Sequence, residues 1–360
     1  MKILFSEGEE YYRALGLKDI EGARFVFDGM RFYIKSEVYL SQFQIFVCAY
    51  YTMPHNVILT RKFNKMGIKT VLCSDGIFDF ANAINNPMHT KYSLKLFHPI
   101  LQDFFLCIGK NERDYFMQDT IALDFMPDRV ISKEEPVTMP KIRKVLITTA
   151  NTAYFNDEEY ELLLRLMLDV VNLLKEENVD FSFRIFDKRL MNEIENNCDF
   201  CTGNDLKESF EDTLKRYSSV ITTPSSVAVV SMFHKRPTGL LIYRNWPNFL
   251  QTGWLIPSAI VFKSNLDEFV FADESRMAIQ AKLLENYDTK KGISERILEV
   301  SQEQFDAREV YESTVIRYYE NMLLSRFNFN FEWFVRKVYQ RLKKLKFLSN
   351  IISRLKKRIF

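Results

Sequence analysis

The sequence predicts an α/β fold of two doubly wound domains, each a parallel sheet covered by helices on both faces. Two observations lead to this prediction. Short apolar runs bounded by Gly, Asp, Asn and Pro alternate with helix-length segments along most of the chain, which is the pattern of parallel strands joined by helices. A chain of 360 residues is also too long to fold around one ordinary hydrophobic core. Its length fits two domains of roughly 150 residues with an appendage.

The first half of the chain contains five short apolar runs. Helix-length segments between them include 56–66 and 112–120. Because each run is mostly apolar, we expect it to be buried on both faces, as the strands of a parallel sheet are. The expected strands are Lys2–Phe5, Ala23–Phe27, Gln44–Cys48, Lys69–Cys73 and Phe104–Ile108.

A Pro-rich, charged stretch from Pro127 to Pro140 predicts a linker, after which the alternation resumes. A long amphipathic helix is expected over 156–177, because Asn156 and three acidic residues favour a helix N-terminus. The chain is expected to be largely helical after residue 266. The other elements expected in the second half are strands 144–148, 181–186, 219–222 and 238–243 and helices 205–217 and 226–234.

The end of the chain differs sharply in charge from the rest. Residues 333–360 contain ten basic residues and no acidic one, so the rest of the chain carries −8 of the overall charge of +2. Apolar residues recur there every three or four positions, which predicts a basic amphipathic helix lying on an anionic membrane surface. The alternative is a terminal helix that docks on the acidic body. A mildly acidic body does not suit a nucleic-acid partner.

The predicted organisation and location follow from these patterns. No apolar run approaches the roughly 20 residues of a spanning helix, and the first residues do not form a signal peptide. We therefore expect a cytoplasmic protein, peripheral on the inner face of the cell membrane. The expected division is a first domain over 1–130, a second over 141–270, a helical return segment over 271–332 and the basic tail over 333–360.

Hydroxyl side chains cluster between an expected strand and an expected helix in the second domain. Thr222, Thr223, Ser225 and Ser226 precede a helix of small residues. The unpaired N–H groups and the dipole of a helix N-terminus favour an anion. We therefore expect Thr223, Ser225 and Ser226 to bind a nucleotide phosphate. The alternative is simple helix capping, which needs only one hydroxyl.

The surrounding segment, 215–243, carries a family resemblance. Its Thr-Pro-Ser-Ser before the helix and Lys-Arg-Pro after it resemble the nucleotide-phosphate element of GT-B glycosyltransferases, particularly bacterial sialyltransferases and Kdo transferases that use CMP-activated sugars. The resemblance implies that Ser225 and Ser226 hold the CMP phosphate. It also implies a GT-B fold, in which two Rossmann-like domains face a cleft, with the acceptor on the N-terminal side.

A second match lies in the first domain. Ser74-Asp75-Gly76, after the fourth expected strand, is similar to the acidic-acidic-Gly motif of bacterial sialyltransferases, although Ser74 replaces the first acid. The resemblance implies that Asp75 is the general base that deprotonates the acceptor hydroxyl. Asp79 is a second candidate, as its partner or as a nucleophile. A carboxylate at the carboxyl end of a strand is well placed for this chemistry. Gly76 and Asn82 are further candidates for the substrate cleft.

Positive charge is expected from another part of the second domain. The family has a His-Pro pair where this sequence reads Phe183 to Arg189 without His or Pro, so Lys188 or Arg189 would supply charge to a phosphate or a sugar carboxylate. Arg244 and Trp246, in the loop after strand 238–243, are substrate-cleft candidates because Trp faces stack on sugar rings. Core packing explains such Trp residues about as often.

These features predict a glycosyltransferase that moves a sugar, with Kdo or sialic acid from a CMP donor as the leading case, onto a lipid-linked surface glycan such as lipopolysaccharide or capsule. No cofactor or metal is expected beyond the nucleotide sugar, since the Cys198–Cys201 pair lacks partner ligands and P-loop and GxGxxG motifs are absent. Two alternatives stay open: a glycerol- or ribitol-phosphate transferase on the same scaffold, and a non-catalytic membrane adaptor with a degenerate transferase fold.

Overall fold

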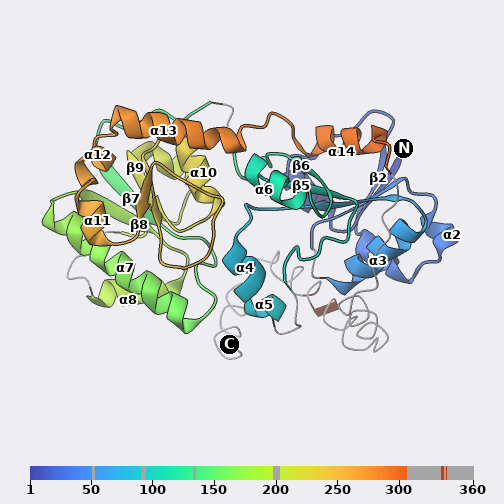
Figure 1. Ribbon diagram of the computed structural model, residues 1–360, viewed down its shortest axis with the longest axis horizontal. Coiled ribbons are helices and arrows are strands. Elements are labelled where there is room, and N and C mark those ends of the chain that lie inside the picture. Colours follow the sequence, from blue (N-terminus) through green and yellow to red (C-terminus); the bar gives the residue numbers. More distant parts are fainter. Residues whose placement is uncertain are drawn as a thin grey trace.

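The computed structural model shows two lobes, each containing one parallel sheet (Figure 1). None of the helices in the part of the chain that it describes is long and apolar enough to cross a membrane. The pair Cys198 and Cys201 lies outside the described residues, and so does the expected tail helix apart from three positions. The structure describes residues 1–50, 53–90, 95–132, 135–197, 203–305 and the single positions 334, 335 and 338.

The first sheet has six parallel strands in the order β2-β1-β3-β4-β5-β6. Its strands are short and apolar, and most of their side chains are buried on both faces. Alternate residues of β1 point to opposite faces. Ile3 packs in a core cluster with helices α1 (Glu9–Ala14) and α14 (Ile293–Gln302), whereas Leu4 packs in a cluster with η1 (Gly29–Ile34), α2 (Glu37–Leu40) and α3 (Pro54–Lys65). The strands are β1 (Lys2–Phe5), β2 (Arg24–Val26), β3 (Ile45–Cys48), β4 (Lys69–Cys73), β5 (Phe104–Cys107) and β6 (Ile121–Asp124).

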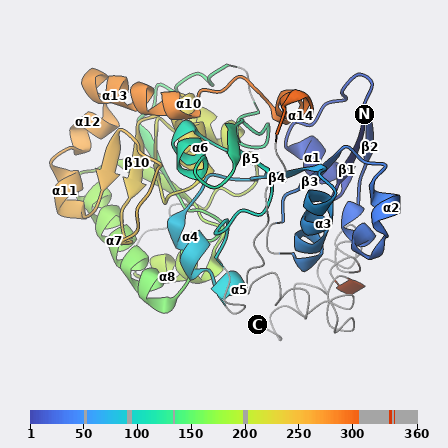
Figure 2. The ribbon, with the colours of Figure 1, turned by 45° about the vertical axis from the view of Figure 1, so that its right-hand side comes forward.

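The helices of the first lobe fill the connections between these strands. They leave the carboxyl ends of the strands facing the second lobe, with α4 and α5 between the lobes in both ribbon views (Figures 1 and 2). These helices are α1 (Glu9–Ala14), η1 (Gly29–Ile34), α2 (Glu37–Leu40), α3 (Pro54–Lys65), α4 (Phe80–Asn85), α5 (Pro87–Thr90) and α6 (Lys110–Phe116).

The second sheet has five parallel strands in the order β11-β10-β9-β7-β8. Val145 of β7 pairs with Phe181 of β8 on one side and with Ser219 of β9 on the other. The strand order therefore reverses between β7 and β9, just as it reverses between β1 and β3 in the first sheet. The strands are β7 (Lys144–Thr148), β8 (Asp180–Arg184), β9 (Ser219–Thr222), β10 (Thr238–Leu241) and β11 (Trp254–Ile256).

The long helix of the second lobe is the one whose N-terminus the sequence marks. Asn156 accepts a hydrogen bond from the N–H of Glu159 and caps the helix, and the buried stripe of this helix packs on the sheet in one core cluster. The helices of this lobe are α7 (Asp157–Glu176), α8 (Lys188–Asn197), α9 (Phe210–Thr213), η2 (Leu214–Arg216), α10 (Ser226–Phe233), α11 (Ala259–Lys263), α12 (Leu266–Val270) and α13 (Glu274–Leu284).

The linker between the lobes is held by a buried arginine. Arg236 follows α10 and has no solvent exposure. Its guanidinium donates hydrogen bonds to five backbone carbonyl oxygens: those of Val137 and Thr138 in the linker, and those of Leu214, Tyr217 and His234 in the second lobe. Burial lowers its pKa to about 10. The Lys-Arg-Pro sequence after α10 thus fixes the linker onto the second lobe.

The chain crosses back to the first lobe after α13, through η3 (Glu285–Tyr287), and ends its described core with α14 (Ile293–Gln302) (Figure 1). Lys69 of β4 donates to the carbonyl oxygens of Val300 and Ser301, which fastens α14 onto the first sheet. At the crossing, Glu112 of α6 is buried beside Asn286 and Tyr287 of η3. Burial raises the pKa of this carboxyl to about 7.

We predict that Glu112 makes stability depend on pH. The unfolded carboxyl loses its proton near pH 4.5, whereas the folded one keeps it to about pH 7. The free energy of unfolding should therefore fall as the pH rises between these values, by about 3 kcal/mol from this residue. Urea unfolding of Glu112→Gln and wild type at about pH 5 and about pH 8 tests this. A difference between the two proteins that does not change with pH would contradict it.

The structure corrects several expected elements. The first part of the expected helix 205–217 is not helical: α9 begins only at Phe210, where Ser209 caps it, and continues as η2. The strand expected over 181–186 begins one residue earlier and ends at Arg184. Strands β6 and β11 were not expected. Both are edge strands, and β11 has only three residues, which is too few for a hydrophobic pattern to reveal.

Candidate functional site

Each sheet has one place where the strand order reverses. In open α/β sheets, ligands bind outside the carboxyl ends of the strands at such a reversal. In the first lobe this position is between β1 and β3, and in the second it is between β7 and β9. The residues that follow these strands therefore decide which lobe can bind an anion.

The crevice of the first lobe is already occupied by a carboxylate of the protein. Glu7 follows β1 and is buried. It accepts hydrogen bonds from the backbone N–H groups of Ala49 and Tyr50, at 3.1 and 3.2 Å, and from the side chains of Asn56 and Tyr12. Burial raises the pKa of Glu7 although these four donors lower it in part. These four donors are therefore already paired with a carboxylate of the protein.

Among the described residues, the crevice of the second lobe contains hydroxyls and no carboxylate of this kind. Thr223 accepts a hydrogen bond from the N–H of Ala150 at 2.8 Å. The hydroxyls of Thr149, after β7, and Ser225, after β9, are buried and have no hydrogen-bond partner in the part of the chain that the structure describes. Ser225 is the N-cap residue of α10, yet its side chain makes no capping bond. Capping therefore does not account for this hydroxyl, and it is available to a ligand.

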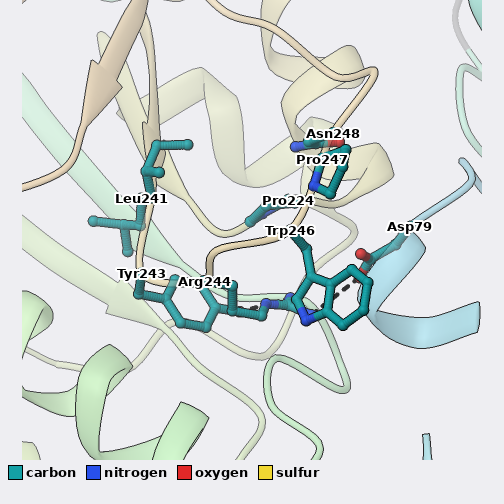
Figure 3. Close-up of a pocket in the computed structure, with 9 residues that line it drawn as sticks. Asp79, Pro224, Leu241, Tyr243, Arg244, Trp246, Pro247 and Asn248 are labelled. Carbon is teal, nitrogen blue, oxygen red and sulfur yellow. Dashed lines mark hydrogen bonds and ion pairs between the residues drawn. The ribbon is translucent and has the colours of Figure 1, made fainter. Parts of the chain in front are cut away.

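A narrow pocket lies beside this crevice, between the lobes (Figure 3). Its volume is about 30 Å³, which is room for about one water molecule. Asn248 contributes a buried side-chain N–H₂ group without a partner among the described residues. The walls come from α4, from the turn before α10 and from the loop after β10, and the lining residues are Asp79, Pro224, Leu241, Ile242, Tyr243, Arg244, Trp246, Pro247 and Asn248.

Arg244 is the charged centre of the pocket, and its side chain is only 6% exposed. It contacts Asp79 of the first lobe at 3.3 Å and Glu159 of α7 at 4.0 Å, and it donates to the Tyr243 hydroxyl at 2.7 Å. Figure 3 shows the guanidinium reaching across to Asp79. Burial alone would lower the pKa of Arg244, but Tyr243, Asp79 and Glu159 raise it overall.

Two further contacts join the lobes around the pocket. Asn85 of α4 donates to Glu159 at 3.3 Å. Phe249, in the loop that follows Arg244, packs its ring against Phe78 and Phe80 of the first lobe, with ring centres 6.2 and 5.2 Å apart. The loop after β10 thus belongs to the second lobe but is held by both lobes.

The structure brings some of the expected site residues together. Asp79, Arg244 and Trp246 line the pocket, and Ser225 and Ser226 follow its wall residue Pro224. Asp79 also caps α4 by accepting the N–H of Ala81 at 2.9 Å.

The other expected site residues lie outside this pocket. Asp75 is half exposed after β4 and pairs with Arg129 at 3.4 Å, and Gly76 beside it has open space around its Cα. Asn82 accepts a hydrogen bond from Asn86 within the α4 region. Lys188 and Arg189 are exposed on α8, where Arg189 pairs with Asp157 at 3.0 Å and lies over the Tyr160 ring.

Sequence reasoning did not single out four residues that the structure places at the two crevices and the pocket. Glu7 and Thr149 each follow a strand next to the order reversal, a position that becomes informative only once the strand order is known. Asn248 and Glu159 reach the pocket from a loop and a helix, and no motif marks them. The polar residue after each apolar run is the signal that could have identified the first two.

Comparisons with known proteins address the fold. No protein-family model matches this sequence, and no curated protein matches it. Among solved structures, a putative UDP-N-acetylglucosamine 2-epimerase from Listeria monocytogenes is similar, with a TM-score of 0.54 and 10% identity, over 87% of this chain and 99% of that one. This chain has the fold of that protein. Two parallel sheets in two Rossmann-like domains are consistent with the expected GT-B architecture.

Two other solved structures are similar at lower scores. The UDP-GlcNAc 2-epimerase of Methanocaldococcus jannaschii, solved with UDP-GlcNAc and UDP, has a TM-score of 0.48 and 11% identity, over 84% of this chain and 99% of that one. CalG4, the calicheamicin glycosyltransferase, has a TM-score of 0.48 and 10% identity, over 85% of this chain and 99% of that one. None of these three proteins is described as using a CMP-linked sugar.

Proposed function

We propose that this protein is a glycosyltransferase that binds a nucleotide sugar in the crevice of its second lobe. One observation carries the proposal: the buried hydroxyls of Thr149, after β7, and Ser225, the N-cap residue of α10, have no partner among the described residues. The first N–H groups of a helix lack acceptors within it and favour an anion. In the first lobe, by contrast, the carboxylate of Glu7 lies at the order reversal and accepts hydrogen bonds from the N–H groups of Ala49 and Tyr50 in the loop after β3. The contrast favours the second lobe as the phosphate site.

Arg244 supplies the positive charge of this site. It is next to the turn before α10, and its present partner is Asp79. Because the pocket has room for only about one water molecule, donor binding requires the contact between Arg244 and Asp79 to open. The phosphate of the donor then replaces Asp79 as the partner of Arg244. This exchange couples donor binding to movement of the two lobes.

The transfer step uses a carboxylate of the first lobe. Asp75 takes the proton of the acceptor hydroxyl, whose oxygen attacks the anomeric carbon of the donor sugar. The bond from that carbon to the phosphate oxygen breaks, and the phosphate leaves with the electron pair. The N–H groups of α10 and the guanidinium of Arg244 stabilise the charge that develops on it. Arg129 orients Asp75 through their ion pair.

The donor that we propose is a CMP-linked sugar such as Kdo or sialic acid, and the acceptor a lipid-linked surface glycan. The support is the resemblance of Thr-Pro-Ser-Ser before α10 and of Asp75-Gly76 after β4 to the enzymes that use such donors. A thermal-shift panel of CMP, CDP, UDP, UMP, GDP and ADP tests the donor, because a ligand that binds only the folded state raises the melting temperature. A selective shift with CMP is expected.

The same panel separates the other functions. A selective shift with UDP or GDP would keep a nucleotide-sugar enzyme and overturn the CMP donor. No shift with any nucleotide would overturn the transferase and favour the adaptor. Ser225→Ala serves as the matched variant: we expect it to reduce the shift, because it removes a hydroxyl that makes no bond to the described residues.

Replacing Asp75 by asparagine should separate catalysis from donor binding. The amide cannot accept the acceptor's proton, so the transfer rate should fall by a factor of about 100 to 10,000. Nucleotide affinity should stay unchanged, because Asp75 does not line the pocket. A transfer assay and a nucleotide titration on the same preparation measure both quantities. Full transfer activity in Asp75→Asn would rule out its role as the base.

A further inference from the structure

The outer end of the first lobe carries aliphatic side chains that nothing in the described chain covers. Ile34, at the end of η1, is 68% exposed, and Val38 in α2 is 86% exposed, with the Tyr39 ring beside them at 39%. Figures 1 and 2 show α2 at the edge of the first lobe that lies away from the second lobe. Single exposed apolar residues are common, but a group of them indicates a contact surface.

The residues around these side chains are mostly basic. Arg31 and Lys35 lie in the same segment, and α3 adds Arg61, Lys62 and Lys65. The segment 29–40 and α3 together contain one acidic residue, Glu37, which pairs with Lys65 at 3.4 Å. We call the exposed residues Arg31, Ile34, Lys35, Val38 and Tyr39, with Arg61 and Lys65 of α3, the α2 surface.

Hydrogen bonds and buried side chains fix the backbone that carries the α2 surface. Lys62 donates from its Nζ to the carbonyl oxygens of Tyr33 and Lys35, at 2.6 and 2.9 Å. Ser36 caps α2 by accepting the N–H of Tyr39, and Phe32 and Leu40 are buried in the core. Ile34 and Val38 therefore point outward on a fixed backbone, and their exposure does not come from a loosely packed segment.

We infer that the α2 surface docks on an anionic lipid surface, with Ile34 and Val38 entering the headgroup region and the basic residues binding lipid phosphates. Charge complementarity selects this occupant, because basic residues near an anionic leaflet are attracted to it and apolar residues among them add burial. A second copy of the chain would bring like charges together, which is unfavourable. This inference is independent of the proposed function, since lipid binding requires neither nucleotide nor acceptor.

Vesicle sedimentation of the full chain tests the inference. The vesicles are an equal mixture of phosphatidylcholine and phosphatidylglycerol, compared with phosphatidylcholine alone. We expect Ile34→Asp combined with Val38→Asp to weaken binding to the anionic vesicles by about tenfold or more, because the change removes insertion and adds repulsion. The matched control is Ile260→Asp combined with Val261→Asp, an exposed pair on α11 of the second lobe, at 85% and 46%. This control should bind like wild type.

Hydrogen exchange on the full chain distinguishes the α2 surface from any other lipid-binding segment. With anionic vesicles, the peptide over residues 29–40 should gain protection, and the peptide over 258–264 should not. Vesicle binding without protection of 29–40 would overturn the inference. Protection of 29–40 that rises with protein concentration in the absence of vesicles would overturn it as well, since it would identify a second copy as the occupant.

Discussion

We expect Arg244→Met to lower the affinity for the nucleotide that stabilises the protein by about 100-fold. A hydrogen bond to a charged group in a buried site contributes about 2 to 3 kcal/mol, and 1.4 kcal/mol corresponds to a factor of ten. Arg244 is the cation of the interlobe pocket and its side chain is 6% exposed, so no water replaces it readily. Calorimetric titration of folded protein measures the change. Arg244→Lys should recover part of the affinity, because it keeps the charge and loses the planar fork.

The partners of Arg244 sharpen this test. Asp79 is the present ion-pair partner of the guanidinium. In the proposed function the donor phosphate replaces it, so Asp79→Asn should tighten nucleotide binding by several-fold, which is about 1 kcal/mol. Arg189→Met is the matched control, since Arg189 is exposed and pairs with Asp157 on the surface. It should change affinity by less than about twofold, as is typical of exposed ion pairs. Weakened binding in Arg189→Met with normal binding in Arg244→Met would contradict this assignment and identify Arg189 on α8 as the residue that binds the phosphate.

The largest loss of stability is expected for Arg236→Met. The guanidinium is fully buried and donates to five carbonyl oxygens of the linker and the second lobe. A methionine fills similar space but leaves these acceptors without their donor. Each buried acceptor left unsatisfied costs about 1 kcal/mol or more, so the free energy of unfolding should fall by about 3 to 5 kcal/mol. Urea unfolding followed by circular dichroism measures the loss.

An exposed arginine of the same region is the control for this change. Arg216 in η2 pairs with Asp205 and Glu208, and its side chain is 46% exposed. Arg216→Met should cost less than about 1 kcal/mol, because exposed pairs contribute little. Equal effects of the two substitutions would contradict a structural role for the carbonyl contacts of Arg236.

The fold class could be predicted from the sequence because the strands are buried on both faces. Runs such as Lys69–Cys73 and Lys144–Thr148 are mostly apolar and do not alternate with polar residues, and the structure has strands at these positions. Short edge strands such as β11 carry too few residues to show a pattern. The non-helical residues before Ser209 show the opposite case, where a helix-like composition is overridden by Arg184, which donates to the carbonyl oxygens of Asp205 and Glu208.

The candidate site could be predicted only where it is local in sequence. The hydroxyl cluster before α10 is contiguous, and the structure places it at a helix N-terminus. The contact between Asp79 and Arg244 joins two lobes across 165 residues of chain, so both residues could be named as candidates but not paired. The role of Glu7 depends on the parallel pairing of β1 with β3, which no local pattern specifies.

For the expected base, Asp75, and the expected cations, Lys188 and Arg189, the sequence likewise did not specify the contacts with distant residues. Asp75 was selected through a motif, and the structure adds Arg129 as its ion-pair partner from a residue beyond β6. Lys188 and Arg189 were selected by position relative to a strand, and the structure places them on an exposed helix end while Arg244 occupies the pocket. Charge in a sequence identifies candidates, and burial decides which of them face a ligand.

The central claim is that the nucleotide phosphate binds at the N-terminus of α10 in the second lobe. Hydrogen exchange of the protein with and without the nucleotide that stabilises it tests this claim most directly. The account predicts protection of the backbone N–H groups over residues 149–151 and 225–229, with little change over residues 6–11 and 49–50 around Glu7. Protection confined to the residues around Glu7 would contradict the claim and place the nucleotide in the first lobe.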